Sequence, residues 1–447
     1  MAQPENSRKE PLSALVSVAT LAAPMLLGQA GQVLLQLTDT LMLGHVGPVA
    51  LAGAGLAGNF LMFALYFAYG ALGAVAPRVA RAFGSGDMSA VGVAMRAGGL
   101  LGAMVGLLIS VSLSAATWAL PRLGQPLEVV AVTGNYLLLL AWSMPFALVS
   151  IALGQAVEAV NRAWPVFAIM AGSVALNAGL NFILIFGHIG FPPMGLEGAG
   201  WATLAARIFQ MITLLGWLAF DRGLVDVRIL RPQRADSAEV WNLFRLGLPV
   251  AAQDVLEGGS FAVGAIMLGW VGTEALAANQ VTIGIASLAW MFPLALAAAT
   301  SVRVAQASGA GDPAAARRAG LTGVGIGVAL MGICAVIYIS FGRVLAGFFT
   351  DDPGVAELTG LLVTIAGIYQ ISDAVQSISL GSLRGLSDNK VPMIANAVCY
   401  WVLSIPTVYL LTFPLGWGAV GVWIGYLPWM ALTGLFFLVR FFKRTAS

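Results

Sequence analysis

Four carboxylates lie inside long apolar segments of this chain, where a charged group meets no bulk water. They are Asp39, Asp254, Glu257 and Asp373. A charged side chain at the centre of a bilayer costs on the order of 2.5–3.5 kcal/mol on insertion scales, so each should face protein or a wet cavity. A buried carboxylate without a basic partner either holds a proton or binds a cation. The four residues are therefore candidates for a proton or cation site.

Asp254 and Glu257 are three residues apart and share one face of a helix. Two carboxylates this close cannot both be charged cheaply, so one should keep a proton or a cation should lie beside them. The alternative is a structural ion pair between one of the four carboxylates and Arg207, the basic residue at comparable depth. Such a pair would leave the other three carboxylates without a partner.

Polar side chains at helical spacing accompany these carboxylates. Steps of three or four residues place side chains on one helix face. They connect four sets of residues: Gln29–Gln32–Gln36–Asp39, Ser173–Asn177–Asn181, Gln370–Asp373–Ser377 and Asn396–Tyr400–Ser404. Hydrogen bonds between membrane helices would explain the Ser and Asn residues equally well. Each half of the chain, however, has one such set that includes a carboxylate. These two sets favour a polar chamber in each half.

The elements that must position these residues are membrane helices. Of the 447 residues, 59% are hydrophobic and 9% are charged, and the mean hydropathy is +0.89. Soluble domains carry roughly a quarter charged residues. Apolar runs of about 20 residues without alternation indicate helices rather than barrel strands. We predict an all-α membrane protein with twelve transmembrane helices, at 14–43, 48–74, 97–119, 130–153, 165–187, 198–220, 243–270, 276–300, 319–341, 357–380, 392–412 and 419–440.

The chain contains a long internal repeat. Residues 24–90 match residues 249–315 at a constant offset of 225, and Pro24 falls on Pro249. Such a repeat is typical of duplicated transporters. Because each half has six helices, an even number, both halves enter the membrane in the same sense. The two six-helix lobes should therefore be related by a pseudo-twofold axis along the membrane normal.

The two halves of the repeat match in sequence, but their carboxylates do not lie at matching positions. The counterpart of Glu257 is Gln32, and the counterpart of Asp39 is Gly264. We therefore expect separate roles for the two lobes.

Basic residues predict the topology. All of the 22 Lys and Arg residues except Arg122, Arg343 and Arg207 fall in segments on the side of the two termini, and cytoplasmic loops are the ones enriched in these residues. We divide the chain into a cytoplasmic tail at 1–13, an N-terminal lobe at 14–220, a solvated cytoplasmic linker at 221–241, a C-terminal lobe at 242–440 and a cytoplasmic tail at 441–447.

Several segments resemble the multidrug and toxic compound extrusion (MATE) transporters. The segment APMLLGQAGQVLLQLTDTLMLGHVG (23–47) is similar to the family's opening pattern of an early Pro, Asp-Thr and two Gly residues. The remaining matches are a cytoplasmic loop motif, present as PRVARAFGSGD (77–87) and VRVAQASGAGD (302–312), and the second-half signatures LAANQV (276–281), MFPLAL (291–296) and GSLRG (381–385).

The resemblance is closest to the NorM-like branch, and it implies where the coupling cation binds. Glu257 and Asp373 match the carboxylates associated with cation binding in the C-terminal lobe. Asp39 and Asn177 match the polar site of the N-terminal lobe. Asn181 stands where the DinF-like branch has Asp, so a two-carboxylate site of that kind is missing from this lobe.

The resemblance also implies substrate contacts. Gln280 and Asp352 fall at positions similar to drug-contacting ones, and Trp290 falls near the position of an aromatic residue beside the cation. Together with Asp39, Asn177 and Asp254, these residues form the candidate set for substrate or proton binding.

These features predict a cation-coupled antiporter that exports amphipathic, mainly cationic drugs and toxic compounds by alternating access. Sodium and proton coupling both remain open. We expect a monomer in the bacterial inner membrane with both termini cytoplasmic. Its partners should be small amphipathic cations and the lipid bilayer, with no nucleic acid and no cofactor beyond the coupling ion, Na⁺ or H⁺.

Two other functions fit the sequence less well. A lipid-linked glycan flippase of the same superfamily binds pyrophosphate and should carry several basic residues at depth, where this chain has Arg207. An intramembrane aspartyl protease needs a motif such as Gly-x-Gly-Asp, which does not surround Asp39, Asp254 or Asp373. Without that motif, we do not expect an enzyme. The sequence also has no phosphate-binding loop, so we do not expect ATP to power transport.

Overall fold

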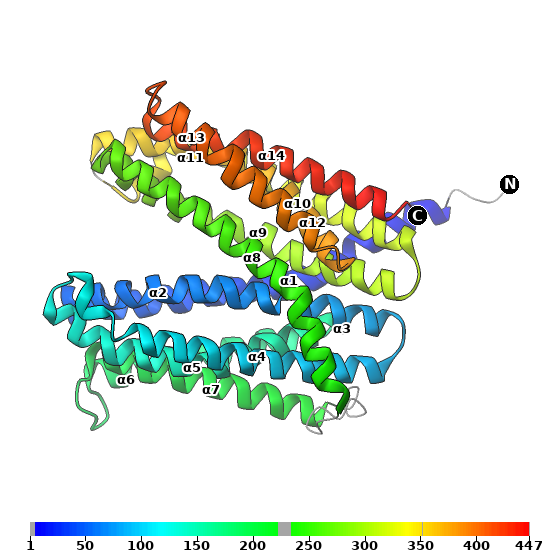
Figure 1. Cartoon of the computed structure of the whole chain (residues 1–447), viewed down its shortest axis with the longest axis horizontal. Coiled ribbons are helices and arrows are strands. Elements are labelled where there is room, and N and C mark those ends of the chain that lie inside the picture. The colour runs from blue at the N-terminus through cyan, green and yellow to red at the C-terminus, as the bar shows by residue number, and fades with distance from the viewer. Residues whose placement is uncertain (1–4, 222–233, 351, 447) are drawn as a thin grey trace. The chain divides into compact units, whose positions relative to one another are not determined.

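The computed structural model describes all residues except 1–4, 222–233, 351 and 447 (Figure 1). These residues form helices and short connections, and no strand occurs among them. Twelve segments are long and apolar enough to cross a membrane. The structure thus confirms the predicted all-helical, multi-pass membrane fold.

The first half of the chain contains seven α-helices, of which α2 and α3 together form one spanning segment, 48–84. They are α1 (Glu5–Val46), α2 (Pro48–Leu72), α3 (Val75–Gly84), α4 (Met88–Ala116), α5 (Leu127–Ala159), α6 (Ala163–Phe186) and α7 (Gly195–Phe220), with a 3₁₀ helix at Leu120–Leu123.

The second half repeats this order, with its fifth spanning segment, 390–412, divided in three. Its elements are α8 (Arg234–Val271), α9 (Thr273–Gly309), α10 (Pro313–Gly347), α11 (Pro353–Gly385), α12 (Lys390–Ala397), a π-helix (Val398–Ser404), α13 (Ile405–Thr412) and α14 (Gly418–Arg444).

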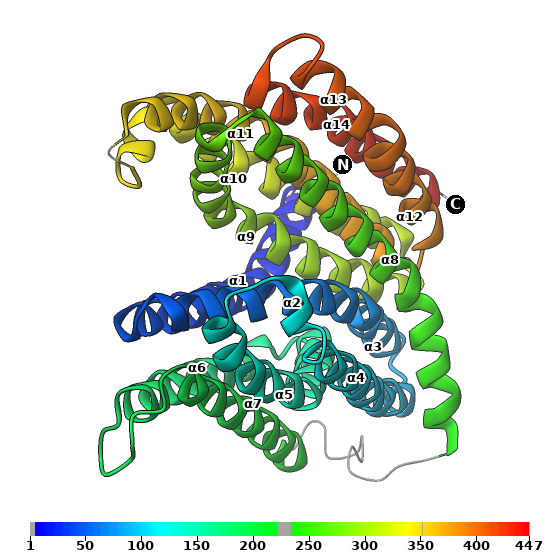
Figure 2. The same ribbon diagram turned by 60° about the vertical axis from the view of Figure 1, so that its left-hand side comes forward.

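The chain folds into two compact units. The first helix of each half, α1 or α8, begins in the unit of the other half and continues in the unit of its own half. Unit 2 is Leu27–Ala251, and unit 1 combines Met1–Leu26 with Ala252–Ser447. The two boundaries follow residues 26 and 251, which differ by 225, the offset of the sequence repeat. The first part of α8 therefore belongs to unit 2, and the first part of α1 belongs to unit 1. Figures 1 and 2 show the start of α8 beside α3 and α4.

The last part of the expected linker at 221–241 is helical. Residues 222–233 lie outside the described part of the chain, and α8 begins at Arg234. Two carboxylates that we assigned to a solvated loop therefore lie on a helix. Asp236 is 2% exposed and pairs with Arg96 at 3.0 Å, and Glu239 pairs with Arg78 at 2.5 Å. These ion pairs hold the start of α8 on unit 2.

The segments that resemble a cytoplasmic loop motif are mostly helical, which corrects our expectation. The motif at 77–87 lies in α3 and a three-residue turn, and its repeat at 302–312 lies in the end of α9 and a similar turn. Asp87 and Asp312 end the two turns, and each accepts a hydrogen bond from the backbone N–H three residues later. This is the usual bond of an N-cap aspartate, so each motif starts the next helix.

Glycines allow helix backbones to approach closely within unit 2. A Cβ atom at Gly70 of α2 would lie 2.3 Å from the Ala251 backbone, and one at Gly247 of α8 would lie 2.1 Å from the Ala71 carbonyl oxygen. Small residues at such crossings drive packing between membrane helices. The contact therefore fixes the first part of α8 against α2.

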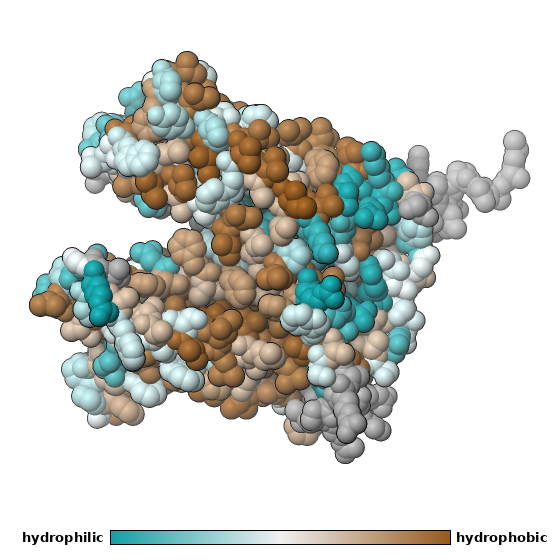
Figure 3. All heavy atoms as spheres, viewed as in Figure 1, coloured by the Kyte–Doolittle hydropathy of each residue, from teal (hydrophilic) through white to brown (hydrophobic). Residues whose placement is uncertain are grey.

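Surface hydropathy follows the helix axes. In each unit, hydrophobic side chains cover the middle of the visible helices, and hydrophilic side chains gather toward helix ends (Figure 3). This pattern is typical of helices that cross a bilayer. The candidate carboxylates lie in the interiors of α1, α8 and α11, within these spanning segments.

Candidate functional site

In unit 1, Glu257 on α8 contacts polar groups of α12 and of the π-helix that follows it. Asn396 Nδ2 donates to Glu257 Oε2 at 3.2 Å, and the Tyr400 hydroxyl lies 3.4 Å from Glu257 Oε1. Asn396 is fully buried and Tyr400 is 1% exposed. Hydrogen bonds to an ionised acceptor are roughly twice as strong as neutral ones. These two donors therefore hold the carboxylate in a defined position.

Asp373, the other carboxylate expected at the cation site, is buried on α11. Its Oδ1 accepts a hydrogen bond from Ser377 Oγ at 3.1 Å, one turn further along the helix. Its Oδ2 is buried without a hydrogen-bond partner among the described residues. Asp373 also lies within electrostatic range of Glu257. The structure thus brings these two predicted residues together.

A π-helix positions one of the two donors that face Glu257. Tyr400 lies inside it, and the next residue, Trp401, donates its Nε1–H to the Leu256 carbonyl at 2.9 Å. A π-helix spaces hydrogen bonds five residues apart, and short π segments within α-helices occur frequently at functional sites. Two consecutive side chains of this segment therefore bind adjacent positions of α8.

Asp254 has a basic partner that the sequence analysis missed. Arg384 Nη2, at the end of α11, lies 2.9 Å from Asp254 Oδ1, and both side chains are about a quarter exposed. Arg207, our alternative partner for a carboxylate, donates to Ser143 Oγ at 2.6 Å and interacts with Asp39 through its charge without forming an ion pair with it. Arg384 offsets the charge of Asp254, so repulsion between Asp254 and Glu257 is weaker than their spacing suggested.

The buried oxygens of unit 1 fit a hard cation. Asp373 Oδ2, Asn396 Oδ1 and Gln370 Oε1 are buried and have no hydrogen-bond partner among the described residues. An unsatisfied buried acceptor costs about 1–3 kcal/mol, and carboxylate and amide oxygens are the ligands that hard cations prefer. No group of three or more His, Cys, Asp or Glu side chains that could hold a metal ion occurs in the described chain. A cation here would therefore need amide or hydroxyl oxygens beside the two carboxylates.

Unit 2 has a smaller polar cluster around Asp39. Asn181 Nδ2 donates to Asp39 Oδ1 at 2.5 Å, and the same amide group lies 3.1 Å from Asn177 Oδ1. Asn177 in turn donates to Thr203 Oγ1 at 3.5 Å. The two predicted residues Asp39 and Asn177 are thus linked through Asn181, the position that we noted as lacking a second carboxylate.

The rest of the expected stripe on α1 is described in part. The side chains of Gln32 and Gln36 lie outside the described part of the structure. The contacts that place Asp39 therefore come from α6, which carries Asn177 and Asn181.

Gln280 and Asp352, expected to contact the drug, and Trp290, expected near the cation, are all exposed. Gln280 and Trp290 are exposed side chains of α9. Asp352 is exposed and serves as the N-cap of α11, where its Oδ1 accepts a hydrogen bond from the Val355 N–H at 3.0 Å.

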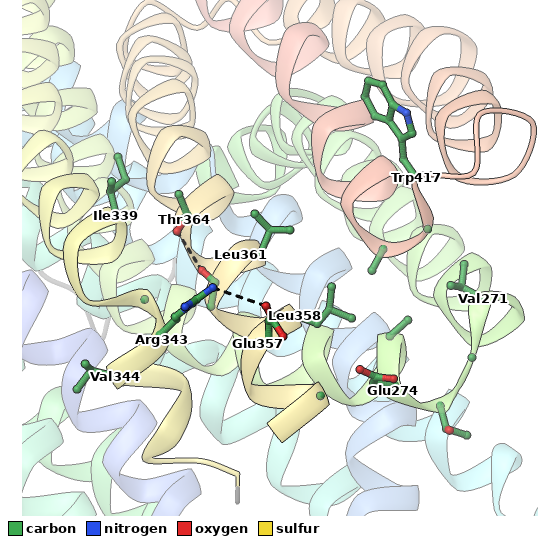
Figure 4. Close-up of a pocket in the computed structure, with 18 of the residues that line it drawn as sticks. Val271, Glu274, Ile339, Arg343, Val344, Glu357, Leu358, Leu361, Thr364 and Trp417 are labelled. Carbon is green, nitrogen blue, oxygen red and sulfur yellow. Dashed lines mark hydrogen bonds and ion pairs between the residues drawn. The ribbon is translucent and has the colours of Figure 1, made fainter. Parts of the chain in front are cut away.

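A pocket of about 980 Å³ lies at the end of unit 1 where α11 begins. Figure 4 shows Arg343 and Glu357 facing each other on its wall, with 3.6 Å between Nη2 and Oε1, and Glu274 on the opposite side. Arg343 and Glu357 are 81% and 78% exposed, and such pairs contribute at most about 1 kcal/mol. Glu257 and Asp373 do not line the pocket. It is therefore a solvated hollow, separate from the carboxylate cluster.

Comparison with known proteins decides the family. The MatE family model matches residues 24–183 and 249–410, once in each half of the repeat. The chain belongs to the MatE family. The two matches begin 225 residues apart, so the family pattern itself follows the internal duplication of this MatE protein.

Curated relatives of this MatE protein cover nearly its whole length. It is 37% identical to the probable multidrug resistance protein NorM of Bradyrhizobium diazoefficiens, over 92% of this chain and 89% of the relative. It is 34% identical to the multidrug resistance protein NorM of Burkholderia vietnamiensis, over 97% and 94%. The resemblance to the NorM-like branch is confirmed.

Solved structures confirm the fold. The crystal structure of the eukaryotic MATE transporter AtDTX14 has a TM-score of 0.86 and 21% identity to this MatE protein, covering 97% of this chain and 99% of the other. The relatives named here are multidrug resistance proteins of the NorM type, and the solved structure is a MATE transporter. This MatE protein is therefore a multi-pass membrane transporter.

Proposed function

We propose that this transporter exports amphipathic, mainly cationic drugs in exchange for Na⁺ or H⁺ by alternating access. We place it in the bacterial inner membrane as a monomer with both termini in the cytoplasm, and with no cofactor other than the coupling ion. The names of the bacterial relatives, which describe multidrug resistance proteins, support drug export.

The cluster around Glu257 and Asp373 is the main observation that supports cation coupling. It combines two carboxylates within electrostatic range, a buried carboxylate oxygen without a partner, and donors that hold Glu257 in place. A bound cation or proton would neutralise this charge and satisfy the free oxygen. It can drive transport because an ion that binds one conformation more tightly shifts the population toward it.

The drug would interact with a second set of residues. Asp39 and Asn177 form a polar cluster in unit 2, and a half-buried carboxylate attracts a cationic drug. Gln280, Trp290 and Asp352 are exposed, and an exposed indole such as that of Trp290 can bind an organic cation through its ring face.

Efflux from proteoliposomes tests the proposal. Vesicles loaded with a fluorescent cationic drug should lose it when a Na⁺ gradient or a pH gradient is imposed, and imposing each gradient separately identifies the coupling ion. Glu257→Gln and Asp373→Asn should each abolish efflux but leave expression and insertion intact, because both remove a charge at membrane depth.

The matched control is Glu357→Gln, which neutralises an exposed carboxylate on the same helix as Asp373. It should transport like the wild type. Wild-type efflux in both Glu257→Gln and Asp373→Asn would refute the cation site. Wild-type protein that responds to neither gradient would refute coupled export altogether.

A further inference from the structure

The hydroxyl of Tyr400 stands between the carboxylate of α8 and the helix α11. It lies 3.4 Å from Glu257 Oε1, 3.2 Å from Gln376 Oε1 and 3.0 Å from Gln376 Nε2. Tyr400 and Gln376 are each 1% exposed, so bulk water does not compete for these bonds. A tyrosine hydroxyl has one hydrogen to donate. It can therefore donate to Glu257 or to Gln376, but not to both.

The charge of Glu257 selects between these two arrangements. When the carboxylate is ionised and free, it is the stronger acceptor and draws the Tyr400 hydrogen. Gln376 Nε2 then donates to the Tyr400 oxygen. When a cation or proton satisfies Glu257, the Tyr400 hydrogen turns to Gln376 Oε1. The amide presents both a donor and an acceptor within reach, so each arrangement keeps the hydroxyl bonded.

The backbone around Tyr400 has no counterpart in unit 2. Pro165 and Pro392 are matching residues of the repeat, and the same offset of 227 places Ser173 opposite Tyr400. Ser173 lies in a regular α-helix, and its hydroxyl donates to the Ala206 carbonyl at 2.9 Å. The tyrosine and the π-helix thus occur in the unit that carries the paired carboxylates.

We propose that Tyr400 is a positioning residue that transmits the charge state of Glu257 to α11 through Gln376. Gln376 lies three residues from Asp373, so the hydrogen bond ends beside the second carboxylate of the cluster. Its use in coupling rests on the proposed function, because a transporter must convert ion binding on one helix into a change on another. The hydrogen-bond switch itself depends only on these three side chains.

Hydrogen–deuterium exchange of α11 tests this role without assuming the identity of the ion. Glu257→Gln imitates a permanently neutral carboxylate. In the otherwise wild-type protein it should change the exchange rate of amides around Gln376 by at least about fivefold, the low end of usual allosteric coupling. Tyr400→Phe keeps the ring, which packs 5.8 Å from the ring of Phe261, and removes the hydroxyl. In that background Glu257→Gln should leave α11 unchanged.

Tyr426→Phe is the matched control. Its hydroxyl, in the same unit, donates to the Ser260 carbonyl at 2.6 Å, so its loss should leave the response to Glu257→Gln intact. Should Tyr400→Phe fail to fold, Gln376→Met should abolish the response in the same way, because it removes both amide partners. A response of α11 that persists in Tyr400→Phe, or in a folded Gln376→Met protein, would overturn the proposal. Absence of drug efflux from wild-type vesicles would refute the proposed function but leave the exchange result standing.

Discussion

In unit 2 the carboxylate of the first helix is Asp39 on α1, whereas in unit 1 the matching helix α8 carries Asp254 and Glu257. The offset of 225 places Glu257 opposite Gln32, which is seven residues before Asp39. Seven residues of α-helix rise about 10 Å. The duplicated helices therefore hold their charges at two depths.

The last spanning helix of each unit shows which residue faces the position of Asp39 or its counterpart. Gly195 and Gly418 have the same φ of 54°, and both begin the last helix of their unit. Their offset of 223 places Thr203 opposite Tyr426. A Cβ at Gly264, the counterpart of Asp39, would lie 2.9 Å from the Tyr426 hydroxyl. Tyrosine thus occupies in unit 1 the space that a carboxylate uses in unit 2.

The two units also differ in how they bind the first part of α1 or α8, the segment that each unit receives from the other half of the chain. Arg78 and Arg303 are matching residues, and each binds the segment that its unit receives. In unit 2, Arg78 pairs with Glu239, and Arg96 adds a buried ion pair with Asp236. In unit 1, Arg303 donates to a backbone carbonyl of α1 at 2.9 Å. Both matching arginines thus bind the segment that begins in the other half, Arg78 through a carboxylate of α8 and Arg303 through a backbone carbonyl of α1.

Removing the carboxylate of Asp236 should lower the stability of the protein more than any other change predicted here. Asp236→Ala leaves Arg96, which is 5% exposed, without its buried counter-charge, and breaking such a pair costs about 3–5 kcal/mol. Arg303→Ala removes hydrogen bonds to a carbonyl and should cost about 1.5–3 kcal/mol. Thermal unfolding of the purified variants measures both. Equal losses would show that the two units hold their exchanged segments equally tightly.

Moving the carboxylate of unit 2 into unit 1 should have an intermediate effect. Gly264→Asp places a side chain against Tyr426, and overpacking of this kind costs about 1–3 kcal/mol. Tyr426→Thr supplies the residue of unit 2 and makes room. In a double-mutant cycle on thermal stability, Tyr426→Thr should therefore reduce the penalty of Gly264→Asp. Additive losses would mean that Tyr426 does not exclude the carboxylate.

The sequence predicted the features that depend on local pattern. Apolar runs predicted the twelve spanning helices, charge inside those runs selected four candidate carboxylates, and the resemblance to the MATE family singled out Glu257 and Asp373 among them. Helical spacing also placed Asn396 and Tyr400 on one face. The offset of the repeat showed that Glu257 and Asp39 have uncharged counterparts.

Features that depend on contacts between distant helices could not be predicted. Arg384 reaches Asp254 across 130 residues of sequence; the sequence places it in a cytoplasmic segment between two predicted helices, and nothing local marks the direction of its side chain. Gln376 lies three residues after Asp373, but we left it out of the polar set Gln370–Asp373–Ser377, because its contact with Tyr400 depends on a distant helix. Asp236 belonged to a stretch of mixed charge that is typical of loops, and its burial becomes visible only with Arg96 beside it.

Neutralising Asp39 should have the smallest effect on stability and a selective effect on transport. In Asp39→Asn the new amide oxygen can still accept the hydrogen bond from Asn181, so the unfolding free energy should change by less than about 1 kcal/mol. The negative charge is lost, however, and with it the attraction for a cationic drug. Efflux of cationic drugs should therefore fall more than efflux of neutral ones of similar size, measured in the same vesicles.

The control for this last comparison is Asn177→Ser, which shortens a side chain of the same cluster and leaves the Asp39 charge in place. It should lower cationic and neutral efflux by similar factors. If Asp39→Asn also lowers both by the same factor, Asp39 acts in coupling or in structure. In that case the carboxylates of both units would serve the same role. The different position of the carboxylate along the repeated helix would then not assign drug binding to one unit and ion binding to the other.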